Sequence, residues 1–489
     1  MRLRHTRGRN VLVALAGTLC LAALAASPAP VSAGFSASTQ NGPSSFTAAA
    51  SFGPSLSQPA ASASCTSETG TSGTCLDGVA LDGPTAVAAS PDGTSVYVAS
   101  FNSHAVAAFA RNATTGRVTQ LAGTAACVSN NGTSGACVTG SQLLDTSGVA
   151  VSPDGLHVYV TSNDPGALTA YTRNTSTSAL TRLAGTAGCV TETGNTGTCV
   201  DGKMMLGLRG VAISPDGKNV YVTSPNSGAV SALARNSTTG AVTPLTGTAA
   251  CTSTSGADGV AANQCVVGTT MAGALGVVVS GDGKNVYVTA PSDSAVVAYS
   301  RNATTGALTR LAGTSGCISD TGTSGACVDG LELWGAGGIA MSPDDLNVYV
   351  TSAWGNTVAV LSRNATTGAL TQLAGTAACV SLTGTGGSCG TGTALNGASA
   401  VTVSPDGRNV YVAATFADAV VAFARNATTG ALTQESGTSG CVSETGTSGA
   451  CTDGRALDGA RGLVVSPDGK DVYVTSGVSS ALAQLTRDR

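Results

Sequence analysis

The sequence has few charged and few aromatic residues. Asp, Glu, Lys and Arg make up 10% of its 489 residues and Phe, Trp and Tyr make up 4%, with three histidines and two tryptophans. The formal net charge is −4, and it becomes −8 without residues 1–33, which hold four arginines and no acidic residue. A mildly acidic, Lys-poor chain argues against nucleic acid and other phosphate-rich partners. The scarcity of histidine and charge also limits the catalytic machinery that the chain can hold.

Long apolar runs are missing as well, apart from a short one near the start. The four arginines precede an apolar stretch from Val11 to Ala26, and the small-residue motif Val31-Ser32-Ala33 follows. This pattern is typical of a secretory signal peptide, and the run is too short to span a bilayer. We expect residues 1–33 to be a signal peptide and residues 34–51 a low-complexity linker. The mature protein is then expected to be secreted or held at the cell surface, with no membrane span.

Repetition is what the chain has in abundance. A Ser-x-Asp turn followed by Val-Tyr-Val recurs at intervals of 62 residues, except for one interval of 66. The seven turns begin at Ser90, Ser152, Ser214, Ser280, Ser342, Ser404 and Ser466. Within one unit, short β-rich segments alternate with turns that contain Gly, Pro or Asn, which indicates four antiparallel strands in meander order. Seven such units predict an all-β chain, a seven-bladed β-propeller that covers residues 52–489.

The two ends of the repeat array complement each other. The last unit stops after its third strand, whereas residues 55–65 align with the fourth strand of another unit at residues 369–379. We therefore expect the N-terminal strand to complete the last blade and to close the ring. Closure would remove two unpaired sheet edges, which otherwise invite aggregation.

All cysteines except Cys20 fall into one pair per repeat. The pairs are Cys65/Cys75, Cys127/Cys137, Cys189/Cys199, Cys251/Cys265, Cys317/Cys327, Cys379/Cys389 and Cys441/Cys451. Even numbers at constant spacing in an exported chain predict one disulfide per repeat, within the loop that leads to the next unit. Zinc binding is the alternative, but two thiols without a nearby histidine do not complete a tetrahedral site. We expect no metal and no other cofactor.

The repeated motifs resemble those of a known family. Ser-Pro-Asp-Gly followed by Val-Tyr-Val-Thr-Ser, as at residues 214–224, resembles the YVTN-type propeller repeat. The element Asn-Ala-Thr-Thr-Gly-Ala-Leu-Thr at residues 302–309 is similar to a turn of the seven-bladed lactonase-like propellers. The resemblance covers nearly the whole mature chain and implies the fold. It leaves the activity open, because this superfamily includes lactone hydrolases, lyases and non-catalytic surface proteins.

Propeller topology sorts the loops onto two faces. The nearly constant Ser-x-Asp and Asn-x-Thr-Thr-Gly turns share one face, and the variable loops between the second and third strands share the other. The variable loops and the segments that approach each blade carry the aromatic side chains, which a recognition surface uses. We predict that a ligand contacts Trp334, Trp354, His104 and Phe416. The alternative for these residues is that they pack over the central channel.

Catalytic candidates are fewer. His104 stands on the variable face, and Glu332, Arg209 and Asp164 are charged residues on or near it that differ between repeats. These four could act as acid, base or electrostatic stabiliser. No Ser-His-Asp order, metal-ligand cluster or phosphate loop stands out in the sequence.

Three functions follow as hypotheses. The first is a binding or cell-envelope interaction module, whose partner would be a protein, a carbohydrate or a small molecule. The second, implied by the resemblance, is a lactonase-like hydrolase of a small cyclic ester. The third is a purely structural wall or matrix protein. The chain is expected to be monomeric.

Overall fold

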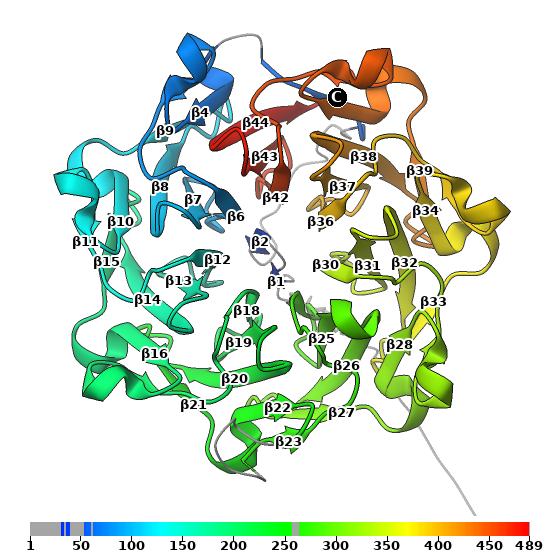
Figure 1. Cartoon of the computed structure of the whole chain (residues 1–489), viewed down its shortest axis with the longest axis horizontal. Helices are drawn as coiled ribbons and strands as arrows, with labels where there is room; N and C mark the ends of the chain where they lie inside the picture. Colours follow the sequence, from blue (N-terminus) through cyan, green and yellow to red (C-terminus); the bar gives the residue numbers. More distant parts are fainter. Residues whose placement is uncertain (1–30, 34–35, 40–52, 60–61, 257–263, 489) are drawn as a thin grey trace, which may run out of the picture.

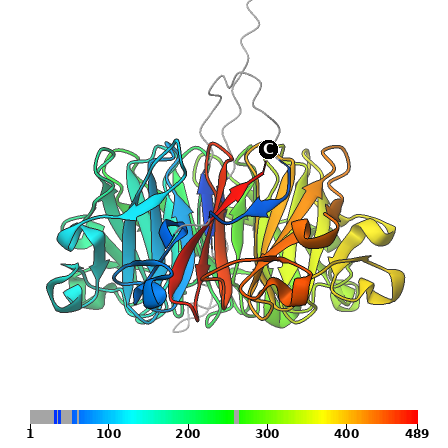
Figure 2. The ribbon, with the colours of Figure 1, turned by 90° about the horizontal axis from the view of Figure 1, so that it is seen from above.

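The chain forms seven radial β-sheet blades around a central channel (Figure 1). Seen from the side, the blades make a flat ring (Figure 2). This computed structural model describes residues 31–33, 36–39, 53–59, 62–256 and 264–488. The predicted all-β, seven-bladed propeller is confirmed. We number the blades 1 to 7 in the order of their Ser-x-Asp turns.

The inner three strands of each blade form an antiparallel meander. The first strands are β6 (Pro84–Ala89), β12 (Thr146–Val151), β18 (Val211–Ile213), β24 (Val277–Val279), β30 (Ala336–Met341), β36 (Ala398–Val403) and β42 (Ala460–Val465). The second strands are β7 (Ser95–Ser100), β13 (His157–Ser162), β19 (Asn219–Ser224), β25 (Asn285–Ala290), β31 (Asn347–Ser352), β37 (Asn409–Ala414) and β43 (Asp471–Ser476). The third strands are β8 (Ala105–Arg111), β14 (Ala167–Arg173), β20 (Ala229–Arg235), β26 (Ala295–Arg301), β32 (Thr357–Arg363), β38 (Ala419–Arg425) and β44 (Ala481–Arg487).

The fourth strand of each blade is interrupted, and both of its halves pair with the third strand. The first halves are β9 (Val118–Gln120), β15 (Leu180–Arg182), β21 (Val242–Pro244), β27 (Leu308–Arg310), β33 (Leu370–Gln372), β39 (Leu432–Gln434) and β3 (Leu56–Ser57). The second halves are β10 (Cys127–Ser129), β16 (Cys189–Thr191), β22 (Cys251–Ser253), β28 (Cys317–Ser319), β34 (Cys379–Ser381), β40 (Cys441–Ser443) and β4 (Cys65–Ser67). A short 3-10 turn separates the halves, as at Gly123–Ala126 in blade 1.

A short parallel strand lies outside the fourth strand of each blade. These strands are β11 (Val138–Thr139), β17 (Val200–Asp201), β23 (Val266–Val267), β29 (Val328–Asp329), β35 (Gly390–Thr391), β41 (Thr452–Asp453) and β5 (Leu76–Asp77). Each pairs with the second half of the fourth strand. A blade therefore ends in an edge strand that the four-strand prediction did not include.

All seven predicted disulfides are present, one per repeat. They are Cys65–Cys75, Cys127–Cys137, Cys189–Cys199, Cys251–Cys265, Cys317–Cys327, Cys379–Cys389 and Cys441–Cys451. Six of them close a separation of 10 residues, and the one in blade 3 closes a separation of 14. Each contributes about 2–3 kcal/mol in the chain-entropy model.

The expectation that both cysteines of a pair lie in a connecting loop was wrong for the first cysteine. It begins the second half of the fourth strand and so belongs to the sheet. The second cysteine lies outside the strands, in a bend directly before the short parallel strand, and is only 3–5% exposed. This position holds for Cys75, Cys137, Cys199, Cys265, Cys327, Cys389 and Cys451. Each disulfide therefore ties the loop to its own blade, and the loop can return as a paired edge strand.

The seam of the ring is closed as predicted. In blade 7 the N-terminal strands β3 and β4 both pair antiparallel with β44, which lies more than 400 residues later in the chain. The Gly53 amide donates to the Asp488 carbonyl (2.9 Å) and the Asp488 amide donates to the Ser55 carbonyl (3.0 Å). The start of the propeller thus supplies the outer edge of its last blade.

Packing between blades explains the Val-Tyr-Val motif. Both faces of every second strand are covered by neighbouring blades, so these strands are buried along their whole length. The seven tyrosines of the motif are 0% exposed. Their hydroxyls find partners at the blade junctions, as buried tyrosines require; for example, Tyr221 donates to the Gly306 carbonyl of the next blade (2.7 Å).

Two short strands lie in the channel (Figure 1). β1 (Val31–Ala33) pairs antiparallel with β24, and β2 (Ser36–Thr39) pairs parallel with β6. They fall inside the segments predicted as signal peptide and linker, most of which lies outside the described residues. Among the residues that the structure does describe, there is no helix of the length and hydropathy needed to cross a membrane.

Candidate functional site

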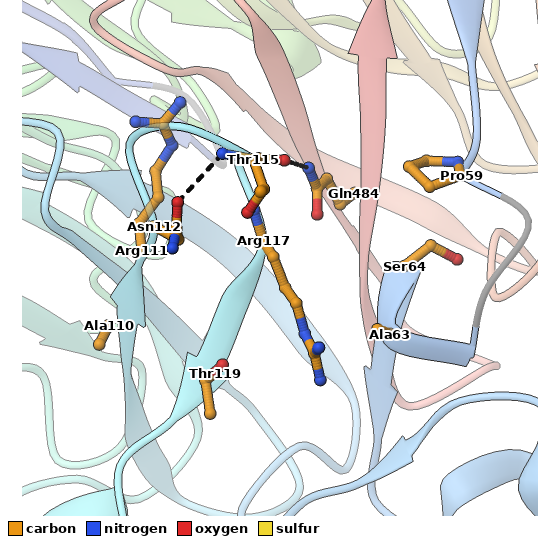
Figure 3. Close-up of a pocket in the computed structure, with 10 residues that line it drawn as sticks. All are labelled: Pro59, Ala63, Ser64, Ala110, Arg111, Asn112, Thr115, Arg117, Thr119 and Gln484. Carbon is orange, nitrogen blue, oxygen red and sulfur yellow. Dashed lines mark hydrogen bonds between the residues drawn. The ribbon is translucent and has the colours of Figure 1, made fainter.

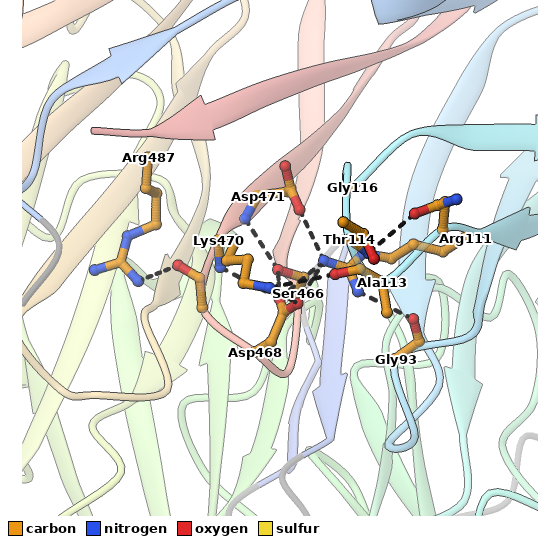
Figure 4. A network of polar contacts seen from close by, with 12 residues as sticks. Gly93, Arg111, Ala113, Thr114, Gly116, Ser466, Asp468, Lys470, Asp471 and Arg487 are labelled. Carbon is orange, nitrogen blue, oxygen red and sulfur yellow. Dashed lines mark hydrogen bonds and ion pairs between the residues drawn. The ribbon is translucent and has the colours of Figure 1, made fainter. Parts of the chain in front are cut away.

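One face of the ring carries the same ion pair in every blade, and we call it the frame face. The arginine that ends each third strand reaches back to the aspartate of the preceding blade's Ser-x-Asp turn, at N–O distances of 2.7–3.1 Å. The pairs are Arg111–Asp468, Arg173–Asp92, Arg235–Asp154, Arg301–Asp216, Arg363–Asp282, Arg425–Asp344 and Arg487–Asp406. Their repetition in every blade gives these arginines a structural role. Figure 4 shows the junction between blades 7 and 1.

Each aspartate also holds its own turn. In blade 3 the Asp216 carboxylate accepts hydrogen bonds from the Ser214 hydroxyl (2.6 Å) and the Lys218 amide (3.1 Å). Burial alone would raise the pKa of Asp216, but these bonds and Arg301 hold it below its usual value. The pKa is lowered in the same way at the other six aspartates. The frame face is therefore occupied by its own ion pairs.

The opposite face carries the loops that differ, and we call it the variable face. It consists of the loops between second and third strands together with the approach loops, which precede each first strand. Backbone bonds join the two kinds of loop: the Phe101 amide donates to the Gly83 carbonyl (2.9 Å) and the Thr415 amide donates to the Gly397 carbonyl (3.0 Å). The two kinds of loop therefore lie next to each other, and the candidate residues are distributed over several blades of this face.

His104 holds two blades together. Its Nδ1 accepts a hydrogen bond from the amide of Asp145, in the approach loop of blade 2 (2.9 Å), which leaves the ring proton of the neutral form on Nε2. Asn356 and Asp418 occupy the same loop position in blades 5 and 6, and their side chains accept the equivalent amide bonds (2.7 and 2.8 Å). His104 therefore has a structural role that does not depend on catalysis.

Glu332 and Asp164 lie apart from His104 along the ring. Glu332 belongs to the approach loop of blade 5, where its carbonyl accepts from Ser352 and Thr357 (2.9 and 3.1 Å). Its carboxylate lies beside Gly355, in the loop that also carries Trp354. Asp164 is exposed in the β13–β14 loop of blade 2. The four catalytic candidates thus come from blades 1, 2, 3 and 5.

Arg209 lies in the approach loop of blade 3, two residues before β18. Its guanidinium lies 5.5 Å from the centre of the Phe101 ring, and none of the described side chains forms an ion pair with it. Burial lowers the pKa of Arg209, the charge of Arg461 lowers it further, and Asp145 opposes both. Arg461, the second residue of β42, occupies the equivalent position in blade 7. Since blades 3 and 7 are separated by the channel, the interaction of these two arginines places them at the channel mouth of the variable face, near Asp145.

The predicted ligand-binding aromatics form a pocket. Trp334, from the approach loop of blade 5, and Trp354, from the β31–β32 loop, meet edge to face with ring centroids 5.9 Å apart at 61°. Phe416, from the β37–β38 loop of blade 6, lines the same hollow of about 520 Å³, together with Ala353, Asn356 and Asn396. The three aromatic side chains are 55–70% exposed. They do not fill gaps beneath other loops.

Glycine in the approach loops makes room for these side chains. Gly335, Gly397 and Gly459 have φ values of +71° to +74°, a region that glycine adopts at little cost. A Cβ added to any of them would lie 2.6–2.8 Å from the side chain of Trp354, Phe416 or Val478, respectively. Each side chain therefore rests directly on backbone, which fixes its position above the face.

Trp354, Phe416 and Val478 occupy one equivalent loop position in three successive blades. We call them the apolar arc; their exposed fractions are 55%, 70% and 69%. Blades 1 to 4 carry polar residues at this position, namely Asn102, Asp164, Asn226 and Ser292. The ion pairs are thus repeated seven times, while exposed apolar residues at this loop position are confined to blades 5 to 7.

A second hollow lies at the seam (Figure 3). It has a volume of about 660 Å³ and lies between blades 7 and 1, with Arg117 and Gln484 in its lining. Gln484 donates to the Thr115 carbonyl (3.2 Å) and to Asp471 (2.9 Å), so it joins the two blades across the seam. The lining also includes neighbours of residues 60–61, which lie outside the described residues, and we assign this hollow no ligand.

Sequence reasoning missed Val478, Asn356, Asn396 and Arg461. Comparing the seven variable loops position by position would have found Val478, because it follows Trp354 and Phe416 in register. The two asparagines gave no such signal, since asparagine is common in turns. Within the described part of the chain, no group of three or more His, Cys, Asp or Glu side chains is placed to hold a metal ion.

Comparison with known proteins agrees with this architecture. Residues 333–489 match the family model described as "Lactonase, 7-bladed beta-propeller". The chain resembles the lactonase-like seven-bladed propellers. The resemblance predicted from the repeat motifs is thereby confirmed. No curated protein matches this chain.

Some solved structures are similar to this chain at low sequence identity. A Bacteroides fragilis protein named as a candidate 6-phosphogluconolactonase is 19% identical, with a TM-score of 0.48 over 71% of this chain and 81% of its own. The Pseudomonas aeruginosa periplasmic gluconolactonase is 18% identical, with a TM-score of 0.39 over 59% and 68%. Kuenenia stuttgartiensis hydrazine synthase is 14% identical, with a TM-score of 0.46 over 84% and 97%.

Proposed function

We propose that this propeller is a binding module whose ligand docks on the variable face, in the pocket formed by Trp334, Trp354 and Phe416. One observation carries the proposal: large apolar side chains stand exposed at the same loop position in blades 5 to 7, whereas blades 1 to 4 have polar residues there. Exposed aromatic residues grouped on loops of a rigid scaffold are typical of recognition sites. Aromatic residues also supply much of the binding energy at interfaces.

The other blades provide matched variants for testing this proposal. Trp354→Asn introduces the residue that blades 1 and 3 carry at the same position, so the loop should keep its fold. A library of oligosaccharides, peptides and lactones is screened by isothermal titration calorimetry. We expect Trp354→Asn to weaken the binding of any ligand found by about 30-fold, the 2 kcal/mol typical of a central aromatic contact. Asn226→Ser, which copies blade 4 into blade 3, is the control and should bind like the wild type. Equal affinity of the Trp354→Asn variant and the wild type would refute the proposal.

The alternative is a lactonase-like hydrolase of a small cyclic ester. Water would add to the ester carbonyl, and cleavage of the ring C–O bond would release a hydroxy acid. The match to the lactonase family model supports this alternative, and so does Arg209, a cation without an ion-pair partner among the described residues, at the channel mouth near Asp145. A carboxylate would activate the water, and His104 would assist through its Nε2–H, which can donate a hydrogen bond to the ester carbonyl because the Asp145 amide occupies Nδ1.

A panel of lactones separates the two functions. His104→Asn keeps the amide bond, because Asn356 forms it in blade 5, but removes the imidazole. If the Nε2–H of His104 stabilises the reacting carbonyl, this variant loses about 10²-fold or more in turnover. Turnover that survives in His104→Asn, or no turnover by the wild type, would exclude a catalytic role for His104.

We also propose that the protein acts outside the cytoplasm, secreted or at the cell surface. Seven disulfides are compatible with an extracellular or periplasmic location, because oxidising compartments preserve them. Mass spectrometry of the native chain would test the predicted signal peptide by locating the mature N-terminus.

A further inference from the structure

We propose that the pocket of blades 5 and 6 binds a neutral glycan, with one sugar ring against the tryptophan pair and the rest of the glycan along the apolar arc. This inference rests on the proposed function and names its ligand class. Three observations support it: the geometry of the rings, the chemistry of the other lining residues, and the repetition of the apolar position.

The first observation is the tryptophan pair. Trp334 and Trp354 meet at 61°, so they form a corner and not a flat stack. A pyranose has C–H groups on its faces, which pack against the electron-rich face of an aromatic ring. A corner of two rings can hold one face and one edge of the same sugar. More than half of each tryptophan surface is exposed and can be covered by a ligand.

The second observation is that the remaining polar groups are amides. Asn356 accepts the Gly397 amide through Oδ1, and its NH₂ group remains to donate. Asn396 is exposed, and the carbonyl of its backbone fixes the next loop by accepting the Phe416 and Ala417 amides (both 3.1 Å). Amide groups match hydroxyl groups, which donate and accept at the same time. None of the six lining residues is charged, and the Glu332 carboxylate lies beside Gly355 next to the pocket, so the pocket disfavours an anionic ligand, which would lose hydration without gaining a counter-charge.

The third observation is the register of the apolar arc. Trp354, Phe416 and Val478 stand at equivalent positions of successive blades, each resting on an approach-loop glycine. A row of similar contacts at regular intervals suits a ligand built from repeated units. A single small molecule would occupy the pocket alone and leave Val478 exposed. We therefore expect an oligosaccharide to bind more tightly than a disaccharide.

The two tryptophans make the test direct, because they are the chain's whole tryptophan content and both line the pocket. Intrinsic tryptophan fluorescence of the full mature protein is followed during titration with cellohexaose, chitohexaose and maltohexaose. Hexagalacturonate serves as a charged glycan and a Leu/Phe-rich peptide as an apolar non-glycan probe. We expect a saturable spectral change with at least one neutral hexasaccharide, with at least tenfold weaker binding of its disaccharide.

The variants test the glycan assignment, and each negative result leads to a different conclusion. By calorimetry, Val478→Ser, at the position of the apolar arc outside the pocket lining, should weaken hexasaccharide binding by about tenfold but leave the disaccharide unaffected, and the control Asn226→Ser should change neither. Saturable binding of only the peptide or of hexagalacturonate overturns the glycan assignment while the binding-module proposal stands. A spectrum unchanged by all these probes also overturns the glycan assignment, and the broader library screen then decides the proposed function separately.

Discussion

At the scale of single residues, His157 occupies a position on the frame face of blade 2 that is asparagine in blades 3 to 6. Its Nδ1 lies 2.8 Å from the Arg235 guanidinium, where Asn219 and three other asparagines accept the corresponding arginine in blades 3 to 6. Because the guanidinium can only donate, Nδ1 must accept and the ring must be neutral. Burial lowers the pKa of His157, and the charge of Arg235 lowers it further.

This lowered pKa predicts a loss of stability in mild acid. The unfolded histidine takes up a proton near pH 6.5, whereas the folded one resists it, so stability falls as the pH drops below about 6.5. His157→Asn restores the residue of the other blades and should remove this loss. We expect its Tm to exceed that of the wild type by a margin that grows from pH 7 to pH 5. A margin that stays constant over this range would contradict the assigned pKa direction.

Asp471 is a second residue of the frame face that differs from the asparagine of blades 3 to 6. It occupies the position of His157 in blade 7, so Arg111 of blade 1 meets two carboxylates, Asp468 (2.8 Å) and Asp471 (2.7 Å) (Figure 4). Burial raises the pKa of Asp471 although Arg111 and Gln484 bond it. The extra contacts lie at the junction that closes the ring.

At the scale of elements, the outer edge of blade 7 depends on strands from the other end of the chain. β3 and β4 pair with β44, and the Gln58 side chain exchanges hydrogen bonds with the backbone of Arg455 in the approach loop of the same blade (2.7 and 3.0 Å). Without these strands β44 would present an unpaired edge to solvent.

Truncation tests this closure. We expect deletion of residues 34–64, which removes β3, to lower the Tm and to promote aggregation, and deletion of residues 34–79, which also removes β4, β5 and one disulfide, to prevent the isolation of a soluble monomer. Deletion of residues 34–51 spares all three strands and serves as the control. Calorimetry and size-exclusion chromatography report the outcome. A 34–79 deletion that melts like the control would contradict the closure.

The fold was predictable because each repeat contains the local sequence signals for one blade. The Ser-x-Asp turn, the Val-Tyr-Val strand and the cysteine pair each indicate one piece of a blade, and a single unit read seven times yields the ring. The interruption of the fourth strand was not predictable, because its 3-10 turn, as at Gly123–Ala126, depends on pairing of both halves with the same neighbour. For the same reason the sequence did not show that Cys127 lies in a strand while its partner Cys137 stays in the loop.

The site was predictable only in part. Trp334, Trp354 and Phe416 were recognisable as exposed aromatics on variable loops, and the structure brings them to one pocket. The structural bond of His104 could not be foreseen, because its partner is a backbone amide 41 residues away. The proximity of Arg209 to Phe101 and Arg461 joins three blades, and no local pattern encodes such a contact.

At the scale of the whole molecule, the repeated ion pairs and the proposed binding pocket lie on opposite faces. Seven ion pairs and seven disulfides hold a rigid ring, and the exposed apolar arc lies on blades 5 to 7 of the variable face. The channel mouth, with Arg209 and Arg461, is the competing location for chemistry. Where the ligand sits therefore distinguishes a binding module from a hydrolase.

The most direct measurement is a crystal structure of the protein bound to the tightest ligand found in the calorimetric screen. Our account predicts ligand density against Trp334, Trp354 and Phe416, with the Asn356 and Asn396 amides in contact with it. Density at the channel mouth against Arg209 and His104, with the aromatic pocket empty, would contradict it.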